Sequence, residues 1–255
     1  MLLVGDVGNT QTVLGLYDGD DLVHDFRIES TPNRTLDELH VLLRSLVDVA
    51  EVSRDEIEAA IIASVVPAVT ETMQRAVSLA FGVEALVVGP GIKTGMSILY
   101  ENPREVGADR IVNAVAAYDI VDGAVIVVDF GTATTFDVVS AKGEYLGGVI
   151  APGIRISADA LFARAAKLPR VEVAKPPKVI GRNTIHSMQS GIVYGYVGLV
   201  DGMVERIREE LGIETAVIAT GGLARLVEPE SRVIERVEEF LTLDGLRLLY
   251  QRNRA

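Results

Sequence analysis

Residues 2–10 read Leu2-Leu-Val-Gly-Asp-Val-Gly-Asn-Thr10, and residues 125–135 read Val125-Ile-Val-Val-Asp-Phe-Gly-Thr-Ala-Thr-Thr135. In each stretch an apolar run typical of a buried strand ends at an Asp-x-Gly turn, and a second apolar run follows. The two stretches predict an internally duplicated chain. The aligned pairs, at a constant offset of 123 residues, are Asp6 and Asp129, Gly8 and Gly131, Asn9 and Thr132, and Thr12 and Thr135.

Strands and helices extend outward from each copy of the turn. The first copy predicts a meander of strands at 2–4, 12–16 and 22–28, followed by a helix that begins at the capping box of Thr35 and Glu38. A strand at 59–63, a helix from Pro67 to Gly82 and a strand at 85–88 complete this half. The second copy predicts strands at 124–128, 135–139 and 145–151. We therefore expect two α/β lobes, residues 1–118 and 119–255, with a ligand cleft between them.

Helices are also expected from Asn102 to near Gly123, and over residues 183–211. The second of these carries a stripe of glycines on one face. Each glycine costs a helix interior roughly 1 kcal/mol relative to alanine, so the stripe predicts that another backbone packs close to it. That backbone belongs either to the other lobe or to a second copy of the chain. The four glycines are Gly191, Gly195, Gly198 and Gly202.

The bulk composition narrows the class of protein. The 255 residues are 49% hydrophobic but only 5% aromatic, which is typical of Val-, Ile-, Leu- and Ala-rich strands covered by helices. A formal net charge of −12 disfavours nucleic acid and anionic membrane surfaces as partners. The absence of cysteine excludes disulfides, thiol catalysis and zinc–cysteine sites. No signal peptide or apolar span is predicted, so we expect a cytoplasmic protein.

The duplicated turn has the chemistry of a phosphate and magnesium site. An Asp at the end of a buried strand presents a carboxylate, and the following Gly lets the backbone N–H groups approach an anion. A single Asp-x-Gly more often only shapes a turn, but two copies in matching strand contexts favour a functional role. A third turn, Thr220-Gly-Gly222, follows a strand at 216–219 and could hold a nucleotide at a helix N-terminus or serve as a plain turn.

Asp109 and Arg110 form a candidate catalytic pair early in the helix that follows Asn102. Asp109 could accept a proton from a substrate hydroxyl while Arg110 steers anionic groups. The alternative is an ordinary helix N-terminal acid, or an ion pair within the chain. The three histidines stand beside no nucleophile motif, so structural roles are expected for them.

The chain resembles the type III pantothenate kinases, which belong to the superfamily of acetate and sugar kinases, chaperone ATPases and actin. The resemblance spans nearly the whole chain and implies a duplicated actin-like, ribonuclease H-like fold of two lobes with an ATP cleft. Six ordered motifs carry it: Asp6-Val-Gly-Asn-Thr10, Asn102-Pro-Arg-Glu-Val-Gly-Ala-Asp-Arg110, Asp129-Phe-Gly-Thr-Ala-Thr-Thr135, Gly147-Gly-Val-Ile-Ala-Pro-Gly153, Thr220-Gly-Gly222 and Leu241-Thr-Leu-Asp-Gly245.

The resemblance implies ATP-dependent phosphorylation of pantothenate, the first step of coenzyme A synthesis, by a homodimer that needs Mg²⁺ and K⁺ or NH₄⁺. It makes Asp109 the general base, Asp6 a magnesium neighbour and Asp129 the residue that binds the monovalent cation. The residues implied to contact ATP are Asp6, Val7, Gly8, Asn9, Thr10, Gln11, Thr12, Val13 and Thr132, and the glycine turn adds Gly221 and Gly222. Those implied to contact pantothenate are Tyr100, Gly107, Ala108, Asp109, Arg110 and Thr184, the last in its own or the partner's site.

Two other functions fit parts of the pattern. A kinase of the same superfamily that acts on a sugar or a short acid would share both Asp-x-Gly turns, and only the motif from Asn102 to Arg110 favours pantothenate. A nucleotide-binding regulatory protein without catalysis would also keep those turns. The acidic charge and the intact Asp109–Arg110 pair weigh against the regulatory function.

Overall fold

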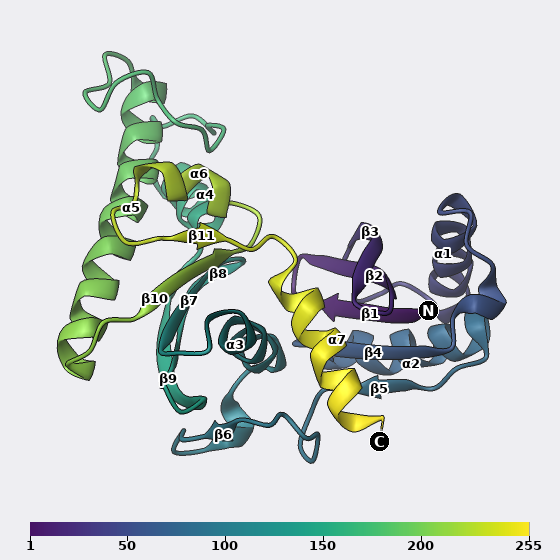
Figure 1. Ribbon diagram of the computed structural model, residues 1–255. Coiled ribbons are helices and arrows are strands. Elements are labelled where there is room, and N and C mark those ends of the chain that lie inside the picture. Colours follow the sequence, from purple (N-terminus) through teal and green to yellow (C-terminus); the bar gives the residue numbers. More distant parts are fainter. Residues whose placement is uncertain (255) are drawn as a thin grey trace. The chain divides into compact units, whose positions relative to one another are not determined.

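The structure is a computed structural model that describes residues 1–254, and the chain divides into two units (Figure 1). The first unit contains Met1–Ser97, Glu101–Ala116 and the C-terminal stretch from Leu241 onward. The second unit contains Ile98–Tyr100 and Ala117–Phe240. None of the helices in the described chain is long and apolar enough to cross a membrane.

The first unit is a five-stranded sheet with the order β3-β2-β1-β4-β5. β1 pairs antiparallel with β2 and parallel with β4, so an antiparallel meander is extended by parallel strands. Helices α1 and α2 cover one face and α7 lies on the other (Figure 1). The strands are β1 (Leu2–Val7), β2 (Gln11–Asp18), β3 (Asp21–Glu29), β4 (Ala59–Ser64) and β5 (Ala85–Val87), and the helices are α1 (Leu36–Val49), α2 (Pro67–Phe81) and α7 (Leu241–Asn253), with short 3₁₀ turns η1 (Arg54–Glu56) and η2 (Pro103–Glu105).

Local signals set the ends of α1 and α2. Thr35 accepts a hydrogen bond from the Glu38 N–H, and the Glu38 carboxylate accepts one from the Thr35 N–H at 2.8 Å, which confirms the predicted capping box. Pro67 stands in the first turn of α2, and Gly82 ends it in the left-handed region at φ 71°. Both helices place apolar stripes against the sheet, where Leu43, Met73 and their neighbours are buried.

The second unit repeats this architecture with one strand more. Its sheet order is β11-β10-β7-β8-β9-β6, so β9-β8-β7-β10-β11 corresponds to β3-β2-β1-β4-β5. The helix α3 (Ala108–Val121) begins in the first unit and ends in the second. The remaining elements are β6 (Ser97–Ile98), β7 (Val125–Phe130), β8 (Ala133–Val139), β9 (Glu144–Pro152), α4 (Ile154–Arg164), α5 (Thr184–Leu211), β10 (Ala216–Thr220), α6 (Ala224–Val227), η3 (Glu228–Glu230) and β11 (Arg236–Val237).

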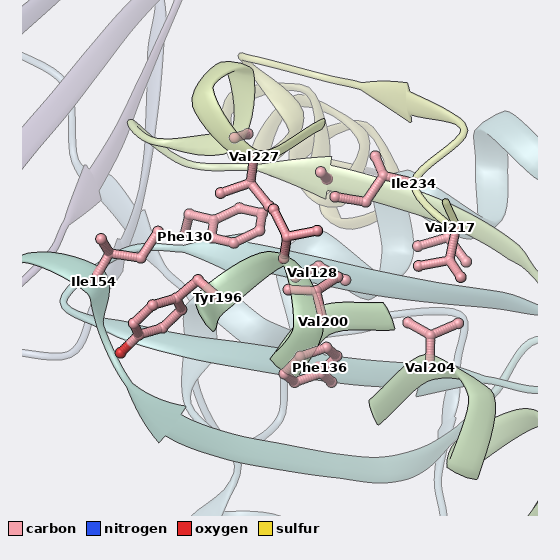
Figure 2. Close-up of a cluster of buried hydrophobic side chains, with 14 of the residues drawn as sticks. Val128, Phe130, Phe136, Ile154, Tyr196, Val200, Val204, Val217, Val227 and Ile234 are labelled. Atoms are coloured by element: carbon pink, nitrogen blue, oxygen red, sulfur yellow. The ribbon is translucent and has the colours of Figure 1, made fainter. Parts of the chain in front are cut away.

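The core of the second unit lies between its sheet and the helices α4, α5 and α6 (Figure 2). Phe130 and Phe136 point from the sheet toward Tyr196 and Val200 of α5 (Figure 2). The Tyr196 hydroxyl donates to the carbonyl of Pro152 at 2.7 Å and lies 2.6 Å from the Ser157 hydroxyl. Its one polar atom is therefore satisfied at the edge of an otherwise apolar cluster.

The common topology of the two sheets agrees with the predicted duplication, but the constant offset is wrong in detail. Asp6 stands opposite Val13 in the β1–β2 hairpin, whereas Asp129 stands opposite Thr135 in the β7–β8 hairpin. The second turn is therefore one residue shorter. By pairing register the counterpart of Thr12 is Thr134, and the alignment of Thr12 with Thr135 is incorrect.

Three other expectations need correction. The stretch after Asn102 is not one helix, because the 3₁₀ turn η2 ends at Glu105 and α3 starts only at Ala108. The helix after the Thr220-Gly-Gly222 turn is a single turn, which offers little helix dipole to a nucleotide. The two-residue strands β6 and β11 and the helix α7 were not predicted.

Candidate functional site

The turn that follows Asp6 is held closed by its own backbone. The Gly8 N–H donates to the carbonyl of Gln11 at 3.0 Å. A Cβ atom at position 8 would also lie 3.0 Å from that carbonyl oxygen, so the turn leaves little room for a side chain there. The side chains at the tip of the turn are polar and exposed: they belong to Asn9, Thr10 and Gln11.

The residues on either side of this tip are buried. The side chain of Thr12 is 1% exposed, and its hydroxyl lies 2.9 Å from that of Ser30. Val7 is fully buried in the core of the first unit. Any contact that Val7 or Thr12 makes with a ligand therefore has to use the backbone. The turn presents a strand-end carboxylate, Asp6, together with exposed polar groups, which suits an anion that carries a divalent cation.

Asp109 and Arg110 stand in the first turn of α3. The Arg110 backbone N–H donates to Asp109 Oδ1 at 2.8 Å, and Arg110 itself is buried. A Cβ atom on Gly107 would come within 2.5 Å of the same carboxylate oxygen, so glycine is what lets the chain pass close to Asp109. Burial raises the pKa of the Asp109 carboxyl, and the Arg110 N–H and the charge of Arg110 oppose that rise only in part. A carboxylate with a raised pKa is better suited to accept a proton than an ordinary Asp.

Three motifs of the sequence meet around Asp129 in the second unit. Asp129 ends β7 beside Thr220 of β10. Gly221 adopts φ 89°, and a Cβ atom there would lie 2.6 Å from Asp129 Oδ1, so the glycine turn packs its backbone directly on this carboxylate. A Cβ atom on Gly153 would lie 2.1 Å from the Thr132 carbonyl oxygen and 2.8 Å from that of Gly131. The three turns thus pack closely on one another through their backbones.

Tyr100 is anchored at another part of β9. The Leu99 N–H donates to the Tyr145 carbonyl at 2.8 Å, which places Tyr100 beside this strand. Its ring lies 6.4 Å from the ring of Tyr145, and it passes Gly147, which has a φ of 133°. The Tyr145 hydroxyl donates to Asp137 Oδ1 at 2.7 Å, and both of these side chains are fully buried. β9 therefore contacts Tyr100 at Gly147, and Gly153, the residue after the strand, packs on the turn that follows Asp129.

Thr184 lines a hollow of about 770 Å³ in the second unit. It stands exposed at the start of α5, one residue after the cap Asn183, whose side chain accepts from the His186 N–H at 2.8 Å. Tyr100 is not among the residues that line this hollow. Its polar lining is Ser157, Arg182, Asn183, Thr184 and Ser187, and its apolar lining includes Leu161, Met188, Ile192 and Tyr196.

The first three glycines of the stripe on α5 are not packed against other parts of their own unit. A Cβ atom added to Gly191, Gly195 or Gly198 would meet no atom within 4 Å, and all three are exposed. Gly202 differs, because the Arg206 side chain lies 3.1 Å from that position. Within the second unit, therefore, no other backbone packs on the stripe at its first three glycines.

No three His, Cys, Asp or Glu side chains cluster in the described part of the chain. Mg²⁺ in phosphoryl-transfer enzymes commonly uses one or two carboxylates plus substrate phosphates and water, and Asp6 at the strand end fits that donor set. Asp129, whose Oδ1 lies next to Gly131 and Gly221, offers a carboxylate oxygen of the kind that hard cations prefer.

Comparison with known proteins then gives the family. A model of the type III pantothenate kinases matches residues 2–206. The chain belongs to the type III pantothenate kinase family. Type III pantothenate kinases from Geobacter sulfurreducens and Pelobacter propionicus are 59% and 60% identical to it over 254 residues, and the one from Myxococcus xanthus is 57% identical over 255 residues. Each comparison covers 100% of this chain and 100% of the relative.

More distant solved structures share the fold. A Campylobacter jejuni protein assigned provisionally to the Baf family of transcriptional activators aligns with a TM-score of 0.61 at 19% identity, covering 98% of each chain. A Sinorhizobium meliloti protein assigned provisionally as a 2-dehydro-3-deoxygalactonokinase gives 0.60 at 13% identity, covering 100% of this chain and 97% of that one. This type III pantothenate kinase family member therefore has the actin-like α/β fold that its sequence predicts, and it shares the fold with both of these proteins.

The structure brings together some of the predicted site residues. Asp6 to Val13 and Gly107 to Arg110 lie in the first unit. Asp129, Thr132, Gly221 and Gly222 lie near one another in the second unit, which also holds Tyr100 and Thr184. The contacts of Gly153 and Tyr145 were not foreseen as parts of the site. The sequence could have pointed to Gly153, because this residue ends one of the six motifs shared with the family. Nothing in the sequence pointed to Tyr145.

Proposed function

We propose that this chain catalyses the ATP-dependent phosphorylation of pantothenate to 4′-phosphopantothenate, the first step of coenzyme A synthesis. The observation that carries the proposal is membership of the type III pantothenate kinase family over the whole chain. The geometry of Asp109 supports it, because a partly buried carboxylate of raised pKa stands at the start of α3 beside a buried arginine.

Asp109 acts as the general base in this proposal. The reaction forms a bond between the substrate hydroxyl oxygen and the γ-phosphorus of ATP, and it breaks the bond from that phosphorus to the β,γ-bridging oxygen. The hydroxyl proton passes to an Asp109 carboxylate oxygen, and the electron pair of the broken bond leaves with ADP. Because such transfers depend mainly on alignment and charge neutralisation, the protein's task is to hold both reactants in line.

The turn after Asp6 and the turn after Asp129 have different binding roles in this proposal. The segment from Asp6 to Val13 holds ATP phosphates through its backbone and exposed polar tip, and Thr132 and the turn at Gly221 and Gly222 complete the nucleotide site. Mg²⁺ beside Asp6 and a monovalent cation, K⁺ or NH₄⁺, beside Asp129 would supply positive charge toward the phosphates. Tyr100, Gly107, Ala108 and Arg110 contact pantothenate. The two halves of the chain, residues 1–118 and 119–255, correspond to one actin-like lobe each, except that the helix α7 packs in the first unit.

The enzyme works as a homodimer in this proposal, with the α5 glycine face as the contact between copies. The open space over Gly191, Gly195 and Gly198 supports this arrangement, because glycines that pack on nothing in their own unit only weaken their helix. Apolar side chains are also exposed around the start of α5: Val179 at 63%, Ile180 at 82% and Ile185 at 49%. Thr184 stands among them and would reach the site of its own or the partner copy. The cytoplasm, where ATP is available, is the proposed compartment.

A coupled assay of ADP release tests the function. The purified protein is incubated with ATP, Mg²⁺ and K⁺, and with pantothenate, sugars or acetate in parallel. Release with pantothenate alone is expected. Asp109→Asn should abolish the release, whereas Asp119→Asn, an exposed Asp on the same helix, should leave it unchanged. Release only with a sugar or acetate, or with none of the panel, would overturn the proposal in favour of another kinase or of a regulatory nucleotide-binding protein.

A further inference from the structure

The motif Leu241-Thr-Leu-Asp-Gly245 opens the C-terminal helix α7, and the proposed chemistry does not use it. Each of its side chains is nevertheless committed to a contact or to the core. Leu241 and Leu243 are 0% and 1% exposed. Thr242, Asp244 and Gly245 make specific contacts with two other elements of the first unit, α3 and β2. These contacts assign a role to the motif.

Two positions of the motif contact α3. The Thr242 hydroxyl donates to Asn113 Oδ1 at 2.7 Å. Gly245 lies so close that a Cβ atom there would stand 2.3 Å from the Val112 carbonyl oxygen and 2.7 Å from its Cγ1. Such distances do not occur between a real Cβ and a backbone oxygen, so any larger residue at position 245 has to push the two helices apart. Only glycine allows this crossing.

The contact on α3 lies directly after the proposed catalytic pair. Val112 and Asn113 follow Asp109 by three and four residues. Residues at these spacings lie on neighbouring positions of one helix face. A shift of α3 at Val112 therefore moves the Asp109 carboxylate with it, because the two are joined by less than about one and a half turns of rigid helix.

Two further positions, Leu243 and Asp244, contact β2, the second strand of the Asp6 hairpin. The Tyr17 hydroxyl donates to Asp244 Oδ1 at 2.7 Å, and the Tyr17 ring is fully buried. Leu243 packs on the backbone of Gly15, where a Cβ atom would lie 3.0 Å from Leu243 Cδ1. Arg247, one turn further along α7, lies over the Tyr17 ring at 5.7 Å. Leu243 and Asp244 of the motif thus contact the β1–β2 hairpin, whereas Thr242 and Gly245 contact α3.

We infer that Thr242 and Gly245 are positioning residues, which set the Asp109 carboxylate at a fixed distance from the Asp6 turn by joining α3 to the β1–β2 hairpin. The inference rests on the proposed function, because it assumes that Asp109 is the base and that the hairpin holds ATP. An error of about 1 Å in the alignment of reacting groups can cost about 100-fold in rate. Binding of ATP to the hairpin does not require α3 to be in register.

Steady-state kinetics of the full-length enzyme test the inference. Thr242→Val keeps the shape of the side chain and removes the hydroxyl, and Thr242→Ser restores the hydroxyl. We expect kcat to fall about 10-fold in Thr242→Val and about 100-fold in Gly245→Ala, in line with the cost of misalignment. The KM for ATP should stay within about twofold, and Thr242→Ser should recover most of kcat.

Gln251→Ala is the matched control on the same helix. Gln251 also fastens α7, through a 2.9 Å hydrogen bond to Asp20, and it stands six residues beyond the end of the motif. It should lower the melting temperature slightly and leave kcat unchanged. If Thr242→Val lowers the melting temperature but keeps the wild-type kcat, the motif is only structural and the inference fails. Thr242→Val decides the test in this way even if Gly245→Ala does not fold. Absence of turnover in the wild-type enzyme would instead refute the proposed function.

Discussion

At the scale of single residues, the most informative group is the Asp109 carboxyl. It is partly buried at the start of α3, and burial raises its pKa above that of an ordinary Asp. A base of this kind has to lose its proton before it can work. The raised pKa therefore predicts that kcat/KM for pantothenate declines on the acidic side at a pH above about 3.9, the ordinary Asp value. A pH–rate profile whose acidic limb lay at or below that value would contradict the assignment.

The same pKa makes a prediction for stability. The folded state holds the ionised Asp109 less favourably than the unfolded state does, so this group's contribution to stability is complete below about pH 3.9 and is lost as the pH rises through the folded-state pKa. Asp109→Asn removes the charge. It should therefore melt at a higher temperature than the wild type at pH 7, while turnover is lost, and the difference should shrink as the pH falls toward 4. A lower melting temperature for the variant at pH 7 would show that the ionised carboxylate is stabilising.

Asp129 allows a separate prediction about cations. If it holds the monovalent cation while Asp6 faces magnesium, removing K⁺ should affect the enzyme as Asp129→Ala does. Asp129→Ala should therefore lose its response to K⁺, whereas Asp6→Ala should lose activity but keep the response in whatever activity remains. Titrations of K⁺ at fixed Mg²⁺ and ATP measure both. If Asp129→Ala kept an unchanged K⁺ dependence, Asp129 would not be the residue that binds the monovalent cation.

At the scale of elements, the Thr220-Gly-Gly222 turn offers a test with its own control. Gly221 has φ 89° and packs on Asp129, whereas a Cβ atom on Gly222 would meet nothing within 4 Å. Gly221→Ala should lower the free energy of unfolding by about 2 kcal/mol and raise the KM for ATP, because it strains the turn and pushes it from the β7–β8 hairpin. Gly222→Ala should stay within about 0.5 kcal/mol of the wild type. Urea unfolding gives the first quantity, and equal effects of the two variants would contradict the packing argument.

Elements with strong local signals could be predicted from the sequence. Local residues alone predict α1, α2, β1 and β7, and the structure confirms these elements. The local residues are the capping box at Thr35, Pro67 with Gly82, and the apolar runs of the two strands. β6 and β11 are two residues long and exist only because a neighbouring strand pairs with them, so no local pattern could reveal them. The break between η2 and α3 was also missed, since Val106 and Gly107 interrupt a stretch that otherwise reads as helical.

Some residues of the candidate site could likewise be predicted from the sequence, and others could not. Asp6, Asp129 and Asp109 could be selected from the sequence because residue type, strand context and family resemblance pointed to them, although their roles stay predictions. Tertiary contacts could not be selected. Nothing in the sequence says that Gly245 crosses α3 at Val112 or that Gly153 presses on the carbonyl of Thr132, because each pair lies far apart in the chain and meets only after folding.

At the scale of the whole molecule, the open glycine face of α5 predicts an association of two copies. Gly195→Arg should weaken the dimer, because a long charged side chain would stand where a second backbone packs closely. Glu209→Arg adds the same side chain at an exposed site near the end of α5 and should leave the dimer intact. Sedimentation velocity at several concentrations measures the effect. A monomeric wild type, or a Gly195→Arg variant that dimerises normally, would contradict the proposed contact.

The return of the last helix to the first unit has a consequence for synthesis on the ribosome. Domains generally fold in the order in which they are made. Here the residues of the second unit, which ends at Phe240, have all been made before α7, the last piece of the first unit. Until α7 leaves the ribosome, the β1–β2 hairpin and the start of α3 lack the helix that joins them. The nascent chain should therefore complete its second unit before its first.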